Sequence, residues 1–282
     1  MVKLIECPRD AMQGWKNFIP TQTKIEYINS LLQVGFDTLD FGSFVSPKAI
    51  PQMQDSKEVI AELEVLNTDT KLLTIVANPR GAQEAAAFPD IKYLGFPFSI
   101  SETFQQRNTN SSIAEAVKRV QEIQAICQSS NKELIVYISM GFGNPYGDPY
   151  SEQLVFDWTN KLVENGVRII SLADTVGIAS AENVSSICSY LIKSLPDIEI
   201  GVHLHSTHQN WKEKMEAAYN AGCRRFDGAL MGIGGCPMAN DELVGNMNTE
   251  WMIQFLKEKG ETLSLNETAL QHSLQRAAQI FV

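Results

Sequence analysis

Short apolar runs rich in β-branched residues alternate along the chain with longer segments in which apolar residues recur at helical spacing. The alternation repeats eight times, and the predicted strands are 3–7, 38–42, 72–77, 93–98, 133–139, 168–174, 198–205 and 224–230. Strands that alternate with helices indicate βαβ units and a parallel sheet. The run ELIVYIS (133–139) is almost entirely apolar, which is typical of a strand buried on both faces.

Helices are predicted between these strands, among them 23–35, 113–127, 181–195 and 211–222, and two more (247–260 and 264–280) follow the last strand. Eight strand–helix units in 282 residues predict an α/β fold, a (β/α)8 TIM barrel, whose extra C-terminal helices cover the last strand. A doubly wound open sheet is the alternative, although nothing in that fold requires eight repeats. Because no linker or low-complexity tract divides the chain, we expect a single domain over residues 1–282.

Composition narrows the classes of partner. The 23 basic and 33 acidic residues give a formal net charge of −10, which disfavours nucleic acid, since phosphate binding needs a basic face. The first ten residues already contain charges and a proline, so we expect neither a signal peptide nor a membrane span there. Five cysteines without a CxxC pair favour a reduced, cytoplasmic protein. A homodimer is a further possibility that the sequence leaves open.

Chemically distinctive residues gather where the barrel hypothesis demands them, at the C-terminal ends of predicted strands and just beyond. They are Arg9, Asp10, Gln13, Asp40, Ser43, Asn78, Arg80, Ser171, Asp174, His203, His205, Cys236 and Asn246. Because side chains two residues apart in a strand share a face, His203 and His205 are expected to point at one spot. With Asp10 they offer oxygen and nitrogen ligands without thiolate, which suits Mg²⁺ or Mn²⁺.

Each of these residues also has a structural interpretation. Two histidines on a strand are by themselves more typical of the core or the surface, and a lone Asp10 is typical of a turn or an N-cap. Cys236 lies in a glycine-rich loop, GIGGCP (232–237), which either carries a thiol over a pocket or contains the cysteine by chance. Lys48 and Arg107 are candidate cations for an anionic ligand, or solvated surface charges.

These motifs together resemble those of the 3-hydroxy-3-methylglutaryl-CoA (HMG-CoA) lyases, within the wider family of metal-dependent barrel lyases and Claisen synthases. The matching segments span nearly the whole chain: PRDAMQ (8–13), SFVSPKAIPQM (43–53), SLADTVG (171–177), VHLH (202–205), GGCP (234–237) and GN (245–246). The resemblance implies retro-Claisen cleavage of HMG-CoA, or of a close 3-hydroxyacyl-CoA, to acetyl-CoA and acetoacetate. It also implies a divalent cation (Mg²⁺ or Mn²⁺) as cofactor and an acyl-CoA as small-molecule partner.

The resemblance also assigns roles. The implied metal ligands are Asp10, His203, His205 and Asn246. The residues expected in catalysis are Arg9 near the thioester carbonyl, Cys236 as an acid/base group, Asp40 and Asp174. Substrate contacts are expected from Gln13, Ser43, Lys48, Asn78, Arg107 and Ser171.

Of three departures from the family pattern, the first two leave the acyl group open and the third leaves the assignment of Asn246 open. Asp40 replaces a glutamate, residues 206–209 read Ser-Thr-His-Gln where the family has Asp-Thr-Tyr-Gly, and the loop between Cys236 and Asn246 is one residue longer. A Claisen synthase that condenses acetyl-CoA with a 2-oxo acid is one alternative, against which SFVSPK and GIGGCP argue. A non-catalytic acyl-CoA-binding barrel is the other, against which the intact set of Asp10, His203, His205 and Cys236 argues.

Overall fold

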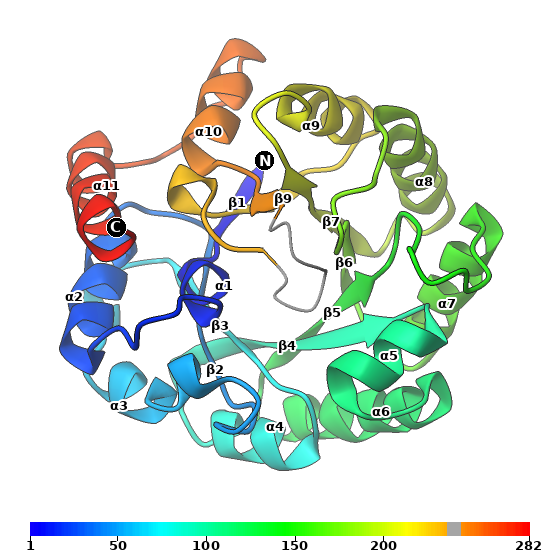
Figure 1. Ribbon diagram of the computed structural model, residues 1–282, viewed down its shortest axis with the longest axis horizontal. Coiled ribbons are helices and arrows are strands. Elements are labelled where there is room, and N and C mark those ends of the chain that lie inside the picture. The colour runs from blue at the N-terminus through cyan, green and yellow to red at the C-terminus, as the bar shows by residue number, and fades with distance from the viewer. Residues whose placement is uncertain (236–243) are drawn as a thin grey trace.

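Eight parallel strands close into a barrel in the computed structural model, which describes residues 1–235 and 244–282 (Figure 1). The barrel strands in order are β1 (Lys3–Glu6), β2 (Thr38–Ser43), β3 (Lys71–Ile75), β4 (Ile91–Ser99), β5 (Glu133–Ser139), β6 (Ile169–Ala173), β7 (Glu199–His203) and β9 (Arg225–Gly228). Strand β9 pairs with β1 and completes the closure. The predicted (β/α)8 TIM barrel is confirmed.

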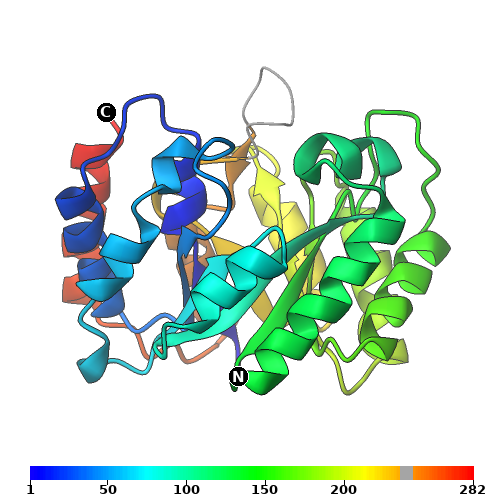
Figure 2. The same cartoon turned by 90° about the horizontal axis from the view of Figure 1, so that it is seen from below.

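Helices surround the barrel (Figure 2). They are α1 (Pro8–Gln13), α2 (Thr21–Leu32), α3 (Ser56–Ala61), α4 (Pro79–Ala86), α5 (Glu102–Thr109), α6 (Ile113–Ser129), α7 (Glu152–Glu164), α8 (Ala181–Ser194), α9 (Trp211–Asn220), α10 (Thr249–Glu258) and α11 (Glu267–Ile280), with short 3₁₀ turns η1 (Pro51–Met53), η2 (Val65–Asn67) and η3 (Leu230–Gly232). Serine caps begin several of them; at α6, Ser112 and Glu115 form a reciprocal capping box.

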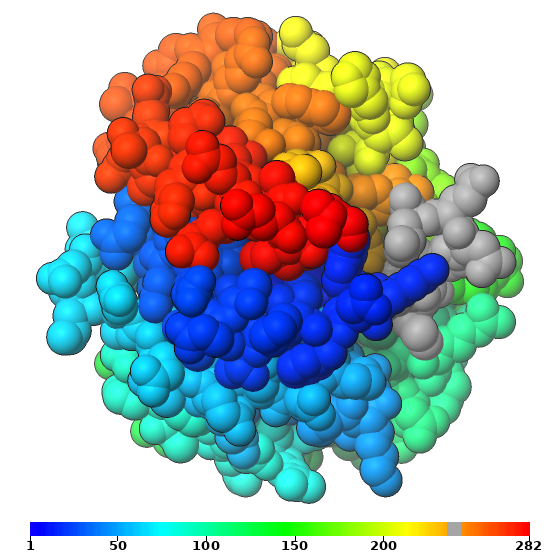
Figure 3. Space-filling view, turned by 60° about the vertical axis from the view of Figure 1, so that its left-hand side comes forward, coloured from blue at the N-terminus to red at the C-terminus, as the bar shows by residue number. Residues whose placement is uncertain are grey.

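The two predicted C-terminal helices are present. Helices α10 and α11 both contact η3, the turn that follows β9, and α11 also packs on α2 (Figure 3). The Oγ atoms of Ser273 and Ser30 lie 3.0 Å apart, and the ring of Phe281 packs edge-on against Trp15. The N- and C-terminal segments therefore share one interface, as a single domain over residues 1–282 requires. One calorimetric transition would test that prediction.

The interior of the barrel has two unlike halves. One side holds an apolar cluster formed by Leu73, Ile75, Tyr93, Ile135, Tyr137 and Ile169. The other side holds buried polar groups, including Asp40, Arg225 and Asp227. Every second residue of a barrel strand points inward. The apolar side is formed by inward residues of β3 to β6, and the polar side by inward residues of β2 and β9. The polar half leads up to the carboxyl ends of β7 and β9.

Candidate metal centre and catalytic pocket

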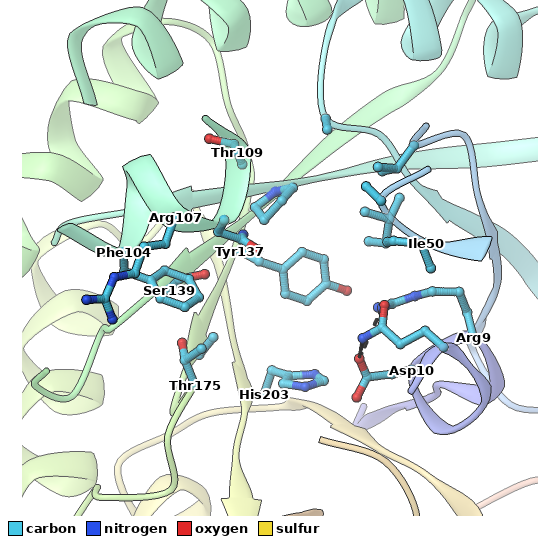
Figure 4. A pocket seen from close by; sticks show the side chains of 18 of the residues that line it. Arg9, Asp10, Ile50, Phe104, Arg107, Thr109, Tyr137, Ser139, Thr175 and His203 are labelled. Atoms are coloured by element: carbon cyan, nitrogen blue, oxygen red, sulfur yellow. Dashed lines mark hydrogen bonds and ion pairs between the residues drawn. The ribbon is translucent and has the colours of Figure 1, made fainter. Parts of the chain in front are cut away.

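A cavity of about 400 Å³ opens at the carboxyl ends of the barrel strands (Figure 4). Its lining includes Arg9, Asp10, Gln13, Arg107, Tyr137, His203 and His205. Active sites of TIM barrels lie at this end of the barrel, because the βα loops converge there. The cavity therefore contains six of the residues that the sequence singled out: Arg9, Asp10, Gln13, Arg107, His203 and His205.

Helix α1 supplies three of these side chains. No helix was predicted for this segment, but Pro8 stands at the first helical position, where its fixed φ favours a helix and its missing N–H costs nothing. Arg9, Asp10 and Gln13 all lie on this one turn and a half of helix. Gln13 lies three residues after Asp10, and its Nε2 donates to Asp10 Oδ1 at 2.6 Å. The helix thus fixes the orientation of the Asp10 carboxylate.

Asp10, His203 and His205 meet at one point. Their ligand atoms all lie within 4.8 Å of one another, and the two imidazole rings are 5.3 Å apart. The predicted strand 198–205 is, however, interrupted. Strand β7 ends at His203, and His205 begins a two-residue strand, β8 (His205–Ser206), that pairs antiparallel with β10 (Gly245–Asn246). The two imidazoles come together although they belong to different sheets.

Asn246 joins this group through the pairing of β10 with β8, which sets it opposite His205. Its Nδ2 donates to Asp10 Oδ2 at 2.7 Å and to the carbonyl of Ile233 at 2.9 Å. Its Oδ1 is buried and has no hydrogen-bond donor among the described residues. A buried amide oxygen without a donor is well suited to a cation. One carboxylate, two imidazoles and one amide oxygen therefore fit a hard divalent ion.

The electrostatics favour the metal-binding forms of these groups. Burial lowers the pKa of His205 to about 4, so its imidazole is neutral at pH 7. Burial opposes ionisation of Asp10, but Arg9, His203 and His205 outweigh it and lower the pKa of this carboxyl. For His203, burial is outweighed by Asp227 and Asp10, and its pKa is raised. A metal ion must therefore displace a proton chiefly from His203.

Arg9 is held between two carboxylates. Its Nε and Nη2 donate to Asp40 Oδ2 at 2.9 and 2.6 Å, and its Nη1 donates to Asp10 Oδ1 at 3.0 Å. Burial lowers the pKa of Arg9, but Asp40 and Asp10 outweigh it, so the guanidinium stays charged. Burial raises the pKa of Asp40 to about 6 in spite of Arg9. A fixed cation and a carboxyl that titrates near neutrality thus lie beside the candidate metal centre.

Two of the expected substrate contacts, Gln13 and Arg107, line the cavity. Arg107 lies 4.7 Å from the ring centroid of Tyr146, which in turn stacks on Phe104. The other four expected contacts lie outside the lining. The hydroxyl of Ser43, at the end of β2, donates to the carbonyl of Ile75 on β3 and accepts from the N–H of Val45. Asn78 caps α4 through Gly81, Lys48 is exposed, and Ser171 is buried. This geometry does not support substrate contacts from those four side chains.

Asp174 does not line the cavity either, and both its oxygens are bonded. Oδ2 accepts from Lys214 Nζ at 2.7 Å, and Oδ1 accepts from the backbone N–H of Ala179 at 3.0 Å. Lys214 also donates to the carbonyls of His205 at 2.9 Å and Gly177 at 3.1 Å. The position expected to be catalytic is therefore part of a buried ion pair that holds the backbone of His205.

The sequence analysis missed Tyr137. Its ring packs edge-on against His203 at 6.0 Å, and its hydroxyl is buried with no partner among the described residues. Figure 4 shows the ring extending across the cavity toward Arg9. The inward alternation of strand 133–139 was the signal that could have identified it, because Tyr137 shares its face with Ile135 near the carboxyl end of the strand.

Cys236 lies outside the described residues, so its expected role stays a prediction. His208 is exposed, and the centroid of its ring lies 5.0 Å from that of Trp251.

The fold and the site together define a TIM-barrel protein with a candidate divalent-metal centre next to a charged arginine. Residues 2–280 match the family model described as HMGL-like, and the chain belongs to this family. The predicted resemblance to the HMG-CoA lyases is therefore confirmed.

The individual relatives that match the chain are also named as HMG-CoA lyases. The chain is 32% identical to the cytoplasmic 3-hydroxy-3-methylglutaryl-CoA lyase of Rattus norvegicus over 92% of this chain and 75% of that protein. It is 32% identical to the mitochondrial hydroxymethylglutaryl-CoA lyase of Bos taurus over 99% of this chain and 84% of that protein. An HMG-CoA lyase structure from Brucella melitensis superposes with a TM-score of 0.92 at 29% identity over 100% of this chain and 99% of that one. An HMG-CoA lyase structure from Acinetobacter baumannii, in complex with coenzyme A and 3-methylmalate, superposes with a TM-score of 0.91. Its sequence identity is 31%, over 99% of this chain and 91% of that one.

No helix in the described part of the chain is both long and apolar enough to cross a membrane.

Proposed function

We propose that this protein is a metal-dependent carbon–carbon lyase that cleaves HMG-CoA to acetyl-CoA and acetoacetate. The observation that carries the proposal is the grouping of Asp10, His203 and His205 on one wall of the cavity, with Arg9 and Asp40 beside them. The family and its relatives support the same reaction. The two alternatives, a Claisen synthase and a non-catalytic acyl-CoA-binding barrel, are not favoured.

A divalent cation held by Asp10, His203, His205 and Asn246 would supply Lewis acidity at the substrate's 3-hydroxyl and at the ketone that forms from it. Mg²⁺ and Mn²⁺ match this donor set best. The chain's own contribution is to hold these four groups in place. Gln13 fixes the Asp10 carboxylate, and the pairing of β8 with β10 sets Asn246 beside His205.

Arg9 is placed to offset negative charge. Cleavage of the bond between C2 and C3 leaves the electron pair on the acetyl thioester as an enolate. A guanidinium fixed by Asp40 and Asp10 needs no reorganisation to stabilise that oxygen, and such preorganised groups act strongly where water is excluded. This geometry supports the role that the resemblance implied for Arg9.

Two protons must move, one from the 3-hydroxyl and one to the enolate carbon. Asp40, with a pKa raised to about 6 by burial, is matched to accepting or returning a proton near neutral pH. Tyr137, whose hydroxyl has no partner among the described residues, can donate a hydrogen bond to a substrate oxygen. Cys236, on the glycine-rich loop, remains our candidate for protonating the enolate carbon.

Arg107 is the candidate contact for the anionic coenzyme. It lies at the rim of the cavity, where Tyr146 supports its guanidinium, and it offers local positive charge on a chain whose net charge is −10. Only the reacting acyl portion need enter a cavity of about 400 Å³.

The cellular setting is also a proposal. The four cysteines in the described residues are free and buried, which suits the reducing cytoplasm. Relatives with both cytoplasmic and mitochondrial names match the chain, so localisation of the tagged protein by microscopy is the test. Absence of membrane and nucleic-acid partners and the open possibility of a homodimer stay predictions; analytical ultracentrifugation tests the last.

The decisive experiment incubates the purified protein with HMG-CoA and either Mg²⁺ or Mn²⁺ and measures acetoacetate. We expect turnover that chelation abolishes and that Asp10→Asn reduces strongly, while His272→Ala, on the exposed face of α11, leaves it unchanged. Formation of a condensation product from acetyl-CoA and a 2-oxo acid would instead identify a synthase. Tight acyl-CoA binding without any acetoacetate would identify a non-catalytic barrel.

A further inference from the structure

A third carboxylate lies below the candidate metal ligands, inside the barrel. We propose that Asp227 is the positioning residue of His203: it accepts the Nδ1 proton, fixes the imidazole in one tautomer and orientation, and leaves Nε2 bare for the ion. The inference rests on the proposed metal-dependent function and adds to it a residue that the sequence motifs do not contain.

The contact follows from strand register. His203 on β7 and Asp227 on β9 are direct partners across the parallel pair, and His203 Nδ1 lies 3.3 Å from Asp227 Oδ2. The side chain of Asp227 is fully buried, so water does not compete for this hydrogen bond. Since an imidazole has two nitrogens, engaging Nδ1 in this way leaves Nε2 as the nitrogen that can bind a cation. The edge-on ring of Tyr137 restricts rotation of the same imidazole.

The negative charge of Asp227 is in turn stabilised by the positive charge of Arg225. Arg225 lies two residues earlier on β9 and therefore on the same inward face, with its side chain 1% exposed. Its Nη1 lies 3.3 Å from Glu199 Oε1, and Asp227 is the group that most raises its pKa against the effect of burial. A line of charged side chains thus runs from Glu199 near the barrel floor through Arg225 and Asp227 to His203.

A glycine, Gly201, leaves the space that the side chain of Arg225 occupies. Gly201 lies between Glu199 and His203 on the inward face of β7, and a Cβ placed there would lie 2.8 Å from Cδ of Arg225. Any larger residue would push the arginine away from its place beneath Asp227. Gly201 is thus part of the support for His203, although it contacts neither the histidine nor the cavity.

The same side chains could instead bind a metal ion directly, and this alternative needs its own test. Cys7 also lies within 4.8 Å of His203 and Asp227, so these three groups could themselves hold an ion. The two readings differ in one residue. If Asp227 positions His203, removing the Cys7 thiol leaves metal affinity unchanged; if the three are ligands, Cys7→Ala weakens binding as much as Asp227→Ala does.

The first measurement needs neither metal nor substrate. The chain contains four histidines, so long-range ¹H–¹⁵N spectra of the apoprotein, labelled at histidine nitrogens and recorded near pH 9, resolve each neutral tautomer, with His203 assigned from His203→Gln. We expect His203 to be protonated at Nδ1 in the wild type. In Asp227→Ala, and less completely in the nearly isosteric Asp227→Asn, the proton should distribute over both nitrogens.

The second measurement is Mn²⁺ affinity by electron paramagnetic resonance, without acyl-CoA. Loss of such a supporting carboxylate weakens metal binding by about 10–100-fold, and we expect that range for Asp227→Ala and a smaller loss for Asp227→Asn. Asp55→Asn is the matched control, because it also removes a buried charge paired with a basic group, Lys24, and neither side chain lines the cavity. It should leave Mn²⁺ affinity unchanged.

Wild-type Mn²⁺ affinity in both Asp227 variants, a His203 tautomer that does not respond to them, or equal losses in Cys7→Ala would each overturn the proposal. Because both readouts are taken without HMG-CoA, a protein that fails to cleave HMG-CoA would still report on Asp227.

Discussion

Breaking the buried pair of Asp174 and Lys214 should destabilise the protein and weaken its metal centre together. Both side chains are 1% exposed, and the three protons of Lys214 are all donated, to Asp174 Oδ2 and to the carbonyls of His205 and Gly177. In Lys214→Met, the Asp174 carboxylate would stay buried, and the Ala179 N–H would be its one remaining donor among residues 1–235 and 244–282.

The expected magnitude follows from that geometry. Removing one partner of a buried ion pair costs about 3–5 kcal/mol, because an uncompensated charge remains in the interior. With an unfolding entropy of about 2.1 cal/mol/K per residue, a chain of 282 residues loses roughly 5–8 °C in Tm. Asp174→Asn combined with Lys214→Met should recover part of the loss, because no charge is then left unpaired.

The assay pairs thermal unfolding with Mn²⁺ affinity. Lys24→Met breaks a comparable buried pair with Asp55 that makes no hydrogen bond to His205, and it should lower Tm similarly without affecting the metal. Lys214→Met should lower both, because it also releases the backbone of His205. Unchanged Tm in Lys214→Met, or no recovery in the double variant, would refute the reasoning. A fall in kcat at unchanged stability in Asp174→Asn would restore the catalytic role first expected of Asp174.

Three further outcomes are expected. Asp40→Asn should lower kcat/KM for HMG-CoA by a factor corresponding to ~1–3 kcal/mol, the size of a buried hydrogen bond, and wild-type kinetics would make the position structural. Cys236→Ala should lower kcat by roughly 10²–10⁴ with Mn²⁺ affinity unchanged, and full activity would leave its cysteine incidental. Burial raises the pKa of Glu6 from 4.5 to about 8, so the unfolded state loses this proton first as pH rises. The stability of the wild type relative to Glu6→Gln should therefore fall between these two pH values in urea titrations; a constant difference would contradict the shift.

The fold was predictable because its signal is repeated. Eight apolar runs at regular intervals need no tertiary information, and the strand 133–139 was predicted with its bounds intact. The cluster of Asp10 with the two histidines was predictable for a similar reason, since the barrel topology alone brings strand ends together. Local helix signals were weaker: α1 was missed although Pro8 marks its first position.

What could not be predicted depends on register and on packing between distant segments. Asp227 meets His203 because β7 and β9 pair with one particular alignment, which no local pattern specifies. Lys214 reads as an ordinary polar residue of an amphipathic helix, yet its ammonium lies buried against Asp174. The break after His203 was hidden because Leu204 is apolar and 2% exposed, as a strand residue would be.

That break has a consequence for how the protein can vary. Asn246 takes its place from its pairing with His205, and Gly245 from its pairing with Ser206, not from the number of residues that precede them. The segment between Gly235 and Gly245 can therefore gain or lose residues in evolution while the amide stays beside Asp10. The additional residue expected between Cys236 and Asn246 would be such a length change, and it would leave the pairing of Asn246 with His205 intact.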